Sequence, residues 1–182
     1  MATETRATVE DLYRIRGKAE LVGGRLRIME PTGWMPGRSS GAIYISLRQH
    51  ERLTCSGVAF PDNVAFLVQL PNRESFSPDA AFHVAPSSGM KFANGAPVFA
   101  AEVRSEHDYG AAAERDMAAK RADYFAAGTL VVWDVDLLSE DVVRVFRVGD
   151  EAIPAAVYRR GELAGAEPAV PGWRMPVDEL FD

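Results

Sequence analysis

The centre of the chain places a long helical segment between two short apolar runs. Residues 97–104 and 129–136 are largely apolar, a pattern typical of strands that are buried on both faces of a sheet. Residues 109–127 predict a helix that ends at Gly128, the position just beyond a helix where glycine is favoured. The apolar faces of such strands must be buried against other elements, so the central segment predicts a sheet with helices packed against it.

The segments on either side of this centre also have regular patterns. Gly23-Gly24 separates two alternating runs and is the two-residue signature of a β-hairpin. In chain order, the expected elements are a helix over 8–16 capped by Thr8, a hairpin over 18–30, a helix from Ser39 or Ser40 through Leu53, short strands over 58–83, a strand over 142–148 and a short helix after Pro176. The order predicts a mixed α/β or α+β fold, with a central mixed sheet flanked by helices. Because no internal repeat or long linker divides the chain, we expect one domain over residues 1–182.

Charge limits what the chain can bind. The 182 residues carry a formal net charge of −6, whereas proteins that coat nucleic acid through bulk charge are strongly basic. The charge is uneven, because residues 1–60 hold 9 Lys+Arg against 6 Asp+Glu and residues 61–182 hold 11 against 20. Any contact with a polyanion is therefore expected to be local and to involve the N-terminal third.

Cys55 and the N-terminal sequence indicate in which cellular compartment the protein is expected. A lone cysteine cannot form an intramolecular disulfide, and the first residues lack the basic and apolar regions of a secretory signal. No apolar run approaches the ~18 residues of a membrane span. We therefore expect a cytoplasmic protein without a membrane segment.

One carboxylate lies inside the first apolar run. Because strand side chains alternate between faces, Glu102 shares its face with Ala100 and Arg104. Burying an unpaired carboxylate is expensive, so Glu102 needs a cation, a metal ion or a change of protonation. Asp79 raises the same question, because it follows Pro78 directly before another apolar stretch.

Lys120 lies on the apolar face of the predicted helix over 109–127. Helical periodicity places it on the side opposite Arg115, so its ammonium is expected to point toward the sheet that carries Glu102. Asp116, four residues earlier, is the expected i,i+4 partner that holds the lysine in position. A structural salt bridge between Lys120 and a sheet carboxylate is the alternative to a catalytic role.

Two carboxylates and an inward lysine fit a metal-dependent phosphodiesterase. Mg²⁺ and Mn²⁺ prefer oxygen ligands and are held through one or two carboxylates together with waters. Such an ion lowers the pKa of a bound water and offsets charge on the phosphate. An ammonium beside it orients the nucleophile or stabilises the same charge.

At these residues the sequence resembles a known family. The runs PDAAF, AAEVRS, YFAAGTLVVWDVD and PGWRMPVDELF, with the D-x-x-x-K of Asp116 and Lys120, are similar to those of the Uma-two family, restriction endonuclease-like proteins in the PD-(D/E)XK nuclease superfamily. The run AELVGGRLRIMEP resembles the opening hairpin of that family. The resemblance spans about residues 10–182. The PD and EV-x-S motifs are weak alone, but their order with the lysine helix and the aromatic-D-x-D strand is fairly specific.

The resemblance implies a restriction endonuclease-like core and a role for each matching residue. Asp79 and Glu102 are expected to ligate Mg²⁺ or Mn²⁺, with the carbonyl of Val103 as a possible further ligand. Lys120 is expected to be the catalytic lysine, moved from the strand to the following helix. Arg104 takes the lysine's usual place in the E-x-K motif, which is a departure from the superfamily pattern.

Glu20 in the hairpin resembles the additional N-terminal carboxylate that many such nucleases use near the metal. A solvated hairpin charge is the alternative. The family often has a histidine after the opening hairpin, whereas this chain has Arg38, Ser39 and Ser40 in that segment.

These features predict a Mg²⁺-dependent endonuclease that cleaves DNA phosphodiesters. The alternative is a catalytically silent DNA- or protein-binding module with the nuclease fold, which the acidic charge and the missing histidine favour. A third hypothesis is that the apolar hairpin and C-terminal segments form a homodimer interface, because such nucleases commonly pair to cut two strands. The residues assigned mainly to packing, capping or the surface are His50, His83, His107, Ser105, Asp134 and Asp136.

Overall fold

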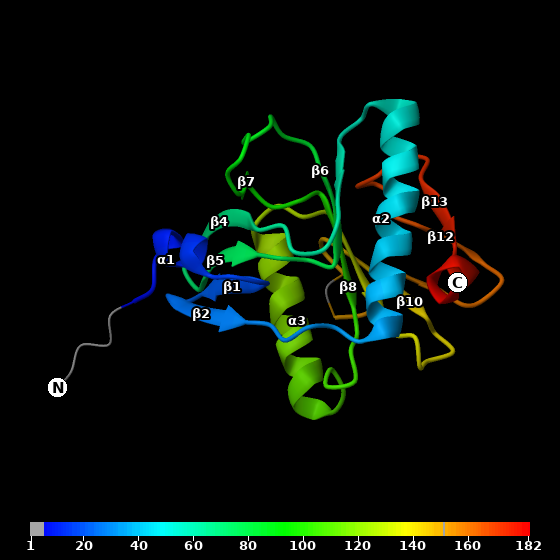
Figure 1. The fold of residues 1–182 in the computed structure, drawn as a ribbon. Helices are drawn as coiled ribbons and strands as arrows, with labels where there is room; N and C mark the ends of the chain where they lie inside the picture. The colour runs from blue at the N-terminus through cyan, green and yellow to red at the C-terminus, as the bar shows by residue number, and fades with distance from the viewer. Residues whose placement is uncertain (1–5, 151) are drawn as a thin grey trace.

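A six-stranded sheet forms the centre of the fold in a computed structural model that describes residues 6–150 and 152–182 (Figure 1). The strands are β3 (Val58–Phe60), β6 (Ala80–His83), β8 (Phe99–Val103), β9 (Val131–Val135), β10 (Val143–Arg147) and β11 (Ala156–Tyr158). Their order across the sheet is β11-β10-β9-β8-β6-β3. Strands β8 and β9 are parallel and the other neighbours are antiparallel. Helix α3 (Ala111–Ala126) connects the parallel pair, as the central sequence pattern predicts.

Two long helices lie on opposite faces of this sheet (Figure 1). On one face, Ile43 of α2 (Trp34–Thr54) packs in the same core as Phe99 of β8. On the other face, Ala100 of β8 packs with Tyr124 of α3. Neighbouring residues of β8 therefore pack against different helices. This confirms the predicted alternation of its side chains between the two faces of the sheet.

The remaining elements surround the central sheet. They are α1 (Val9–Arg14), β1 (Ala19–Val22), β2 (Arg25–Ile28), β4 (Phe66–Leu70), β5 (Arg73–Phe76), β7 (Ala93–Asn94), β12 (Leu163–Gly165), β13 (Arg174–Pro176) and the 3₁₀ helix η1 (Val177–Phe181). Strands β1 and β2 form the hairpin that the sequence predicts. Its turn residues Gly23 and Gly24 have φ of +59° and +74°, a left-handed conformation that favours glycine.

Helix α2 begins earlier than its serines predict. Its first residue is Trp34 and its N-cap is Gly33, so the expected cap at Ser39 or Ser40 is wrong. Both serines lie inside the helix, and the Ser39 hydroxyl donates to the carbonyl of Leu180 in η1 at 2.5 Å. The tertiary contact with the C-terminal segment, rather than capping, explains the buried serine.

The observed architecture confirms the predicted fold class. It is a mixed α/β arrangement with a central mixed sheet, helices on both faces and an N-terminal hairpin. In the part of the chain that the structure describes, no helix combines the length and the apolarity needed to cross a membrane.

Replacing Ser39 with alanine is expected to lower the free energy of unfolding by about 1–3 kcal/mol, because the buried Leu180 carbonyl loses its donor. Ser40→Ala is the matched control, since its hydroxyl bonds to Gly37 of the same helix and contributes little. Urea unfolding of both variants measures the difference. Equal losses would show that the contact with η1 is not what makes Ser39 important.

Candidate active site

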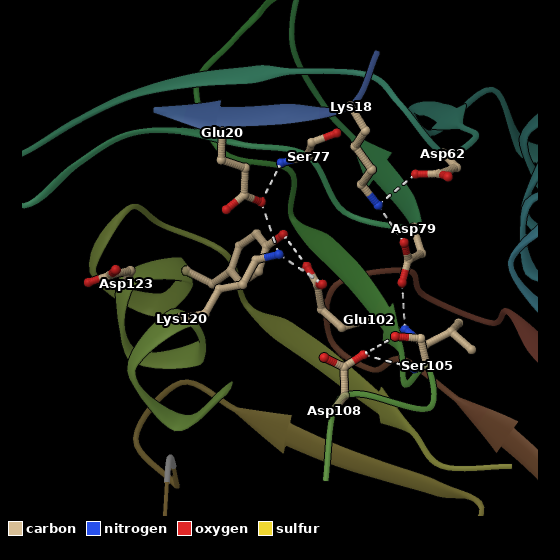
Figure 2. Close-up of polar contacts among 12 residues, drawn as sticks. Lys18, Glu20, Asp62, Ser77, Asp79, Glu102, Ser105, Asp108, Lys120 and Asp123 are labelled. Carbon is tan, nitrogen blue, oxygen red and sulfur yellow. Dashed lines mark hydrogen bonds and ion pairs between the residues drawn. The ribbon is translucent and has the colours of Figure 1, made fainter. Parts of the chain in front are cut away.

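Strand register places Asp79 beside Glu102. In the antiparallel pair β6–β8, Ala80 pairs with Ala101, so the residue before β6 lies opposite Glu102. The backbone N–H of Asp79 extends this ladder by donating to the carbonyl of Ala101 at 3.0 Å. Opposed residues of antiparallel strands direct their side chains to the same face. The two carboxylates that the sequence singled out are therefore neighbours on the sheet (Figure 2).

Helix α3 brings two side chains to Glu102. The Lys120 ammonium lies 2.8 Å from Oε2, and the Tyr124 hydroxyl donates to Oε1 at 2.7 Å. Their i,i+4 spacing places both on one face of the helix. The lysine points toward the sheet, as its helical position predicts. Its ion pairs among the described residues are with Glu102 and Glu20, so the expected pairing with Asp116 is wrong.

Glu20 enters the site from the hairpin (Figure 2). Its Oε1 lies 2.9 Å from the Lys120 ammonium and accepts from the backbone N–H of Ser77, also at 2.9 Å. The residue is only 2% exposed, so it is not the solvated hairpin charge that the sequence left open. Lys120 therefore bridges two carboxylates that come from different parts of the fold.

A second lysine pairs with Asp79. The Lys18 ammonium lies 2.5 Å from Oδ1 of Asp79 and 2.7 Å from Oδ1 of Asp62. Because Lys18 and Glu20 are two residues apart where the hairpin begins, their side chains leave the same face (Figure 2). In the sequence, Lys18 is one of the 9 Lys+Arg of residues 1–60, and no motif marks it. The two signals that were available are this spacing and the presence of only three lysines in the chain.

Arg73 supports Glu20 from the side away from Lys120. Its Nη1 donates to Oε2 of Glu20 at 2.7 Å, and its Nε donates to Oδ2 of Asp123 at 2.8 Å. The arginine is 4% exposed, so both pairs are shielded from water. No sequence motif marks Arg73 or Asp123, because only the packing of β5 against β1 and α3 brings them together.

Burial and neighbouring carboxylates change the protonation of the site. Burial raises the pKa of Glu102, and the negative charges of Asp79 and Glu20 add to this effect, although Lys120 opposes it. Burial disfavours the charged form of Lys120, but Glu102 and Glu20 outweigh it and raise the lysine pKa. Burial likewise opposes ionisation of Glu20, yet Lys120 and Arg73 hold its pKa below the ordinary range. Of these two glutamates, Glu102 is therefore the one whose ionised form the site disfavours.

Arg104 occupies the E-x-K position but belongs to another cluster. Its guanidinium donates to both oxygens of Asp134 at 2.8 and 2.7 Å, and it also pairs with Glu114 near the start of α3. Hydrogen bonds to Asp134 are the largest cause that raises the arginine pKa. Arg104 thus connects α3 to β9 instead of facing the carboxylates on β6 and β8.

The other candidates have structural contacts. The Ser105 hydroxyl donates to Asp108 at 2.7 Å in the loop before α3, and Asp136 accepts from Arg144 at 2.9 Å. His83 is buried and its Nε2 contacts the carbonyl of Asn94 in β7 at 3.1 Å. These contacts agree with the packing and capping roles that the sequence favours for them.

The donor chemistry of the site suits Mg²⁺ or Mn²⁺. Asp79 and Glu102 offer carboxylate oxygens on adjacent strands, the ligand type that these ions prefer. The N–H of Val103 donates to Oδ2 of Asp79 at 2.7 Å. Because a strand residue directs its N–H and C=O to the same neighbour, the Val103 carbonyl also faces the Asp79 side.

The balance of charge is also suited to a divalent cation. Five carboxylates and three cations form the contacts described above, with a formal charge of −2 when all are ionised: Glu20, Asp62, Asp79, Glu102, Asp123, Lys18, Arg73 and Lys120. Within residues 6–150 and 152–182, however, no three acidic, histidine or cysteine side chains are gathered as a ready-made metal site. Ammonium groups lie between the carboxylates instead.

Comparison with protein families assigns the chain to one of them. The family model Uma2, described as "Putative restriction endonuclease", matches residues 9–178. The chain therefore belongs to the Uma2 family, as its motifs predict.

The fold is similar to that of a solved bacterial protein. The crystal structure of "a putative nuclease belonging to DUF820" from Anabaena variabilis matches with a TM-score of 0.72 and covers 96% of this chain and 97% of that one. The sequences are 14% identical, so this likeness shows a shared fold. Comparison with the curated proteins finds no match.

The raised pKa of Glu102 predicts a pH-dependent effect of Glu102→Gln on stability. A carboxyl whose pKa is higher in the folded state stabilises the fold below its ordinary pKa of 4.5 and loses that contribution as the pH rises through the folded-state value. From pH 4.5 upward, the free energy of unfolding of the wild type is therefore expected to fall relative to that of E102Q, which lacks the ionisable group.

Urea unfolding at several pH values measures this trend. Glu106→Gln is the control, because the Glu106 side chain is 87% exposed and a substitution there is expected to change the free energy of unfolding little. A constant difference between E102Q and the wild type at every pH would contradict the shifted ionisation of Glu102.

Proposed function

We propose that this chain is a Mg²⁺- or Mn²⁺-dependent endonuclease that hydrolyses DNA phosphodiester bonds. The observation that carries the proposal is the convergence of Glu20, Asp79, Glu102 and Lys120 from the hairpin, the start of β6, strand β8 and helix α3. Membership of the Uma2 family agrees with it.

Asp79 and Glu102 would hold the metal ion, with the carbonyl of Val103 as a further donor. A bound Mg²⁺ or Mn²⁺ would supply an activated water and offset negative charge on the phosphate. The protein orients both carboxylates by direct hydrogen bonds, from the Tyr124 hydroxyl to Glu102 and from the Val103 N–H to Asp79. Such outer contacts keep ligands in place between binding events.

Lys120 would orient the attacking water and stabilise the charge that develops on the phosphate. An ammonium has three N–H donors, and Glu102 and Glu20 account for two of them among the described residues. Glu20 would position the ammonium rather than react itself. Arg73 and the Ser77 N–H in turn fix Glu20.

The charge distribution is compatible with DNA as the substrate. The site lies in the part of the chain that carries the acidic excess, so a phosphate would be repelled unless a divalent cation neutralised the carboxylates. The hairpin that contributes Lys18 and Glu20 belongs to residues 1–60, where 9 Lys+Arg exceed 6 Asp+Glu. We therefore propose that DNA approaches from the side of the hairpin.

A catalytically silent binding module is the second candidate. It is favoured by the pairing of the proposed metal ligands in the protein alone, because each carboxylate oxygen of Asp79 and Glu102 already accepts from a protein donor. In this case the ion pairs would serve stability, and neither a divalent cation nor cleavage would depend on them.

Lys120→Met and Glu102→Gln are each expected to lower DNA cleavage about 100-fold or more, since they remove charge from the reacting centre. Conversion of supercoiled plasmid and of branched DNA with Mg²⁺ or Mn²⁺ measures this. Lys91→Met and Asp116→Asn are matched controls, because both residues are exposed. Equal cleavage by the wild type and all four variants would remove the assignment of Glu102 and Lys120.

Metal binding separates the two candidate functions without a DNA substrate. Asp79→Asn and Glu102→Gln are expected to weaken Mn²⁺ binding about tenfold or more in calorimetric titrations, because each removes a charged oxygen ligand. Glu106→Gln, at an exposed position, serves as the control. Mn²⁺ affinity that is unaffected by both ligand variants would instead support the silent module.

A further inference from the structure

Lys18 has no task in the proposed reaction, although it is bonded to a proposed metal ligand. Its ammonium lies 2.5 Å from Oδ1 of Asp79, and its side chain is 18% exposed. The other oxygen of Asp79 accepts from the backbone N–H of Val103 at 2.7 Å. The Lys18 ammonium therefore contacts Oδ1, the oxygen of Asp79 that accepts no backbone hydrogen bond from Val103.

We propose that Lys18 is a built-in competitor of the divalent cation, which occupies Asp79 in the metal-free protein and thereby sets the metal affinity of the site. The proposal rests on the metal site argued above. It gives Lys18 a positioning and tuning role, distinct from that of Lys120.

Electrostatics explains the competition. A divalent cation that approaches Oδ1 of Asp79 meets a positive charge already at hydrogen-bond distance. The cation must either displace the Lys18 ammonium or bind despite the repulsion between the two positive charges. Both cases lower the affinity of the site for the cation. Lysine suits this role because its charge is compact and lies at the end of a flexible stem.

Asp62 makes displacement of the ammonium feasible. Its Oδ1 lies 2.7 Å from the Lys18 ammonium, and its side chain is 34% exposed. An ammonium that leaves Asp79 can therefore keep a carboxylate partner and gain contact with water, so it is not left buried and unpaired. Lys120 differs, because it also pairs with Glu20, whose side chain is only 3% exposed and would be left buried without this partner.

A merely structural role for Lys18 is less consistent with the contacts of the hairpin. The hairpin is already held by the buried pair of Glu20 with Arg73 and by the bond from the Leu21 N–H to the Ser75 hydroxyl at 2.8 Å. These contacts attach β1 to β5 without the participation of Lys18. Its charge can therefore change without release of the hairpin.

The first test is Mn²⁺ titration of the full chain by calorimetry. Lys18→Met is expected to bind Mn²⁺ about tenfold more tightly or better than the wild type, because a competing positive charge is gone. Lys18→Arg keeps the charge and is expected to stay close to the wild type, and Lys91→Met, at an exposed position, is the matched control. Unchanged or weaker Mn²⁺ binding by K18M would overturn the proposal.

The second test does not use Lys18→Met, so it holds even if that variant does not fold. The chain has three lysines, so ¹⁵N spectra of the lysine ammonium groups contain few signals, and K18R and K91R assign two of them. Mg²⁺ is expected to move the Lys18 signal with saturation, while the Lys91 signal stays in place. A Lys18 signal that does not respond to Mg²⁺ would overturn the competition.

The outcomes also separate this inference from the proposed function. If wild type and K18M bind Mn²⁺ equally and E102Q binds it poorly, the metal site stands and the role of Lys18 is wrong. If no variant binds Mn²⁺ and the Lys18 signal does not respond to Mg²⁺, both the metal site and the competition are wrong.

Discussion

The ammonium of Lys120 joins three parts of the chain that are far apart in sequence. It lies between Glu20 of the hairpin and Glu102 of the central sheet, at 2.9 and 2.8 Å, while its own backbone belongs to α3. Charges buried in this way are tolerated only when each has a partner, and removal of one leaves the others uncompensated. The orientation of α3 on the sheet is therefore held by this bridge and by the packing of Tyr124 with Phe76.

Two arginines extend the same principle to both ends of α3. Arg104 connects Glu114, in the first turn of the helix, to Asp134 of β9. Arg73 connects Asp123, near the end of the helix, to Glu20. Lys120 lies between these two attachments, so its position is determined on both sides. A charged side chain held in this way has the fixed geometry that a catalytic group needs.

Strand parity and helical periodicity were sufficient for the centre of the site. They place Glu102 on the face of β8 that α3 covers and point Lys120 toward it, because each depends only on neighbouring residues in one regular element. The prediction of a serine cap for α2 was wrong, since the Ser39 hydroxyl serves a contact with the distant carbonyl of Leu180. The expected pairing of Asp116 was wrong for a similar reason. Buried carboxylates from other elements compete better for the ammonium than an exposed neighbour on the same helix.

The sequence by itself determined the hairpin, the central strand–helix–strand unit, the fold class, the family and the residue types of the site, because local periodicity and short motifs carry that information. It did not predict β11 at the edge of the central sheet or the β12–β13 pair, which are three residues long each. Only the tertiary structure decided the partners. It buried Glu20, brought Arg73 behind it and placed Lys18 and Asp62 beside Asp79. Charged side chains choose their partners by distance and burial, which depend on how β1, β5, β6 and α3 pack together. No spacing along the chain encodes those distances.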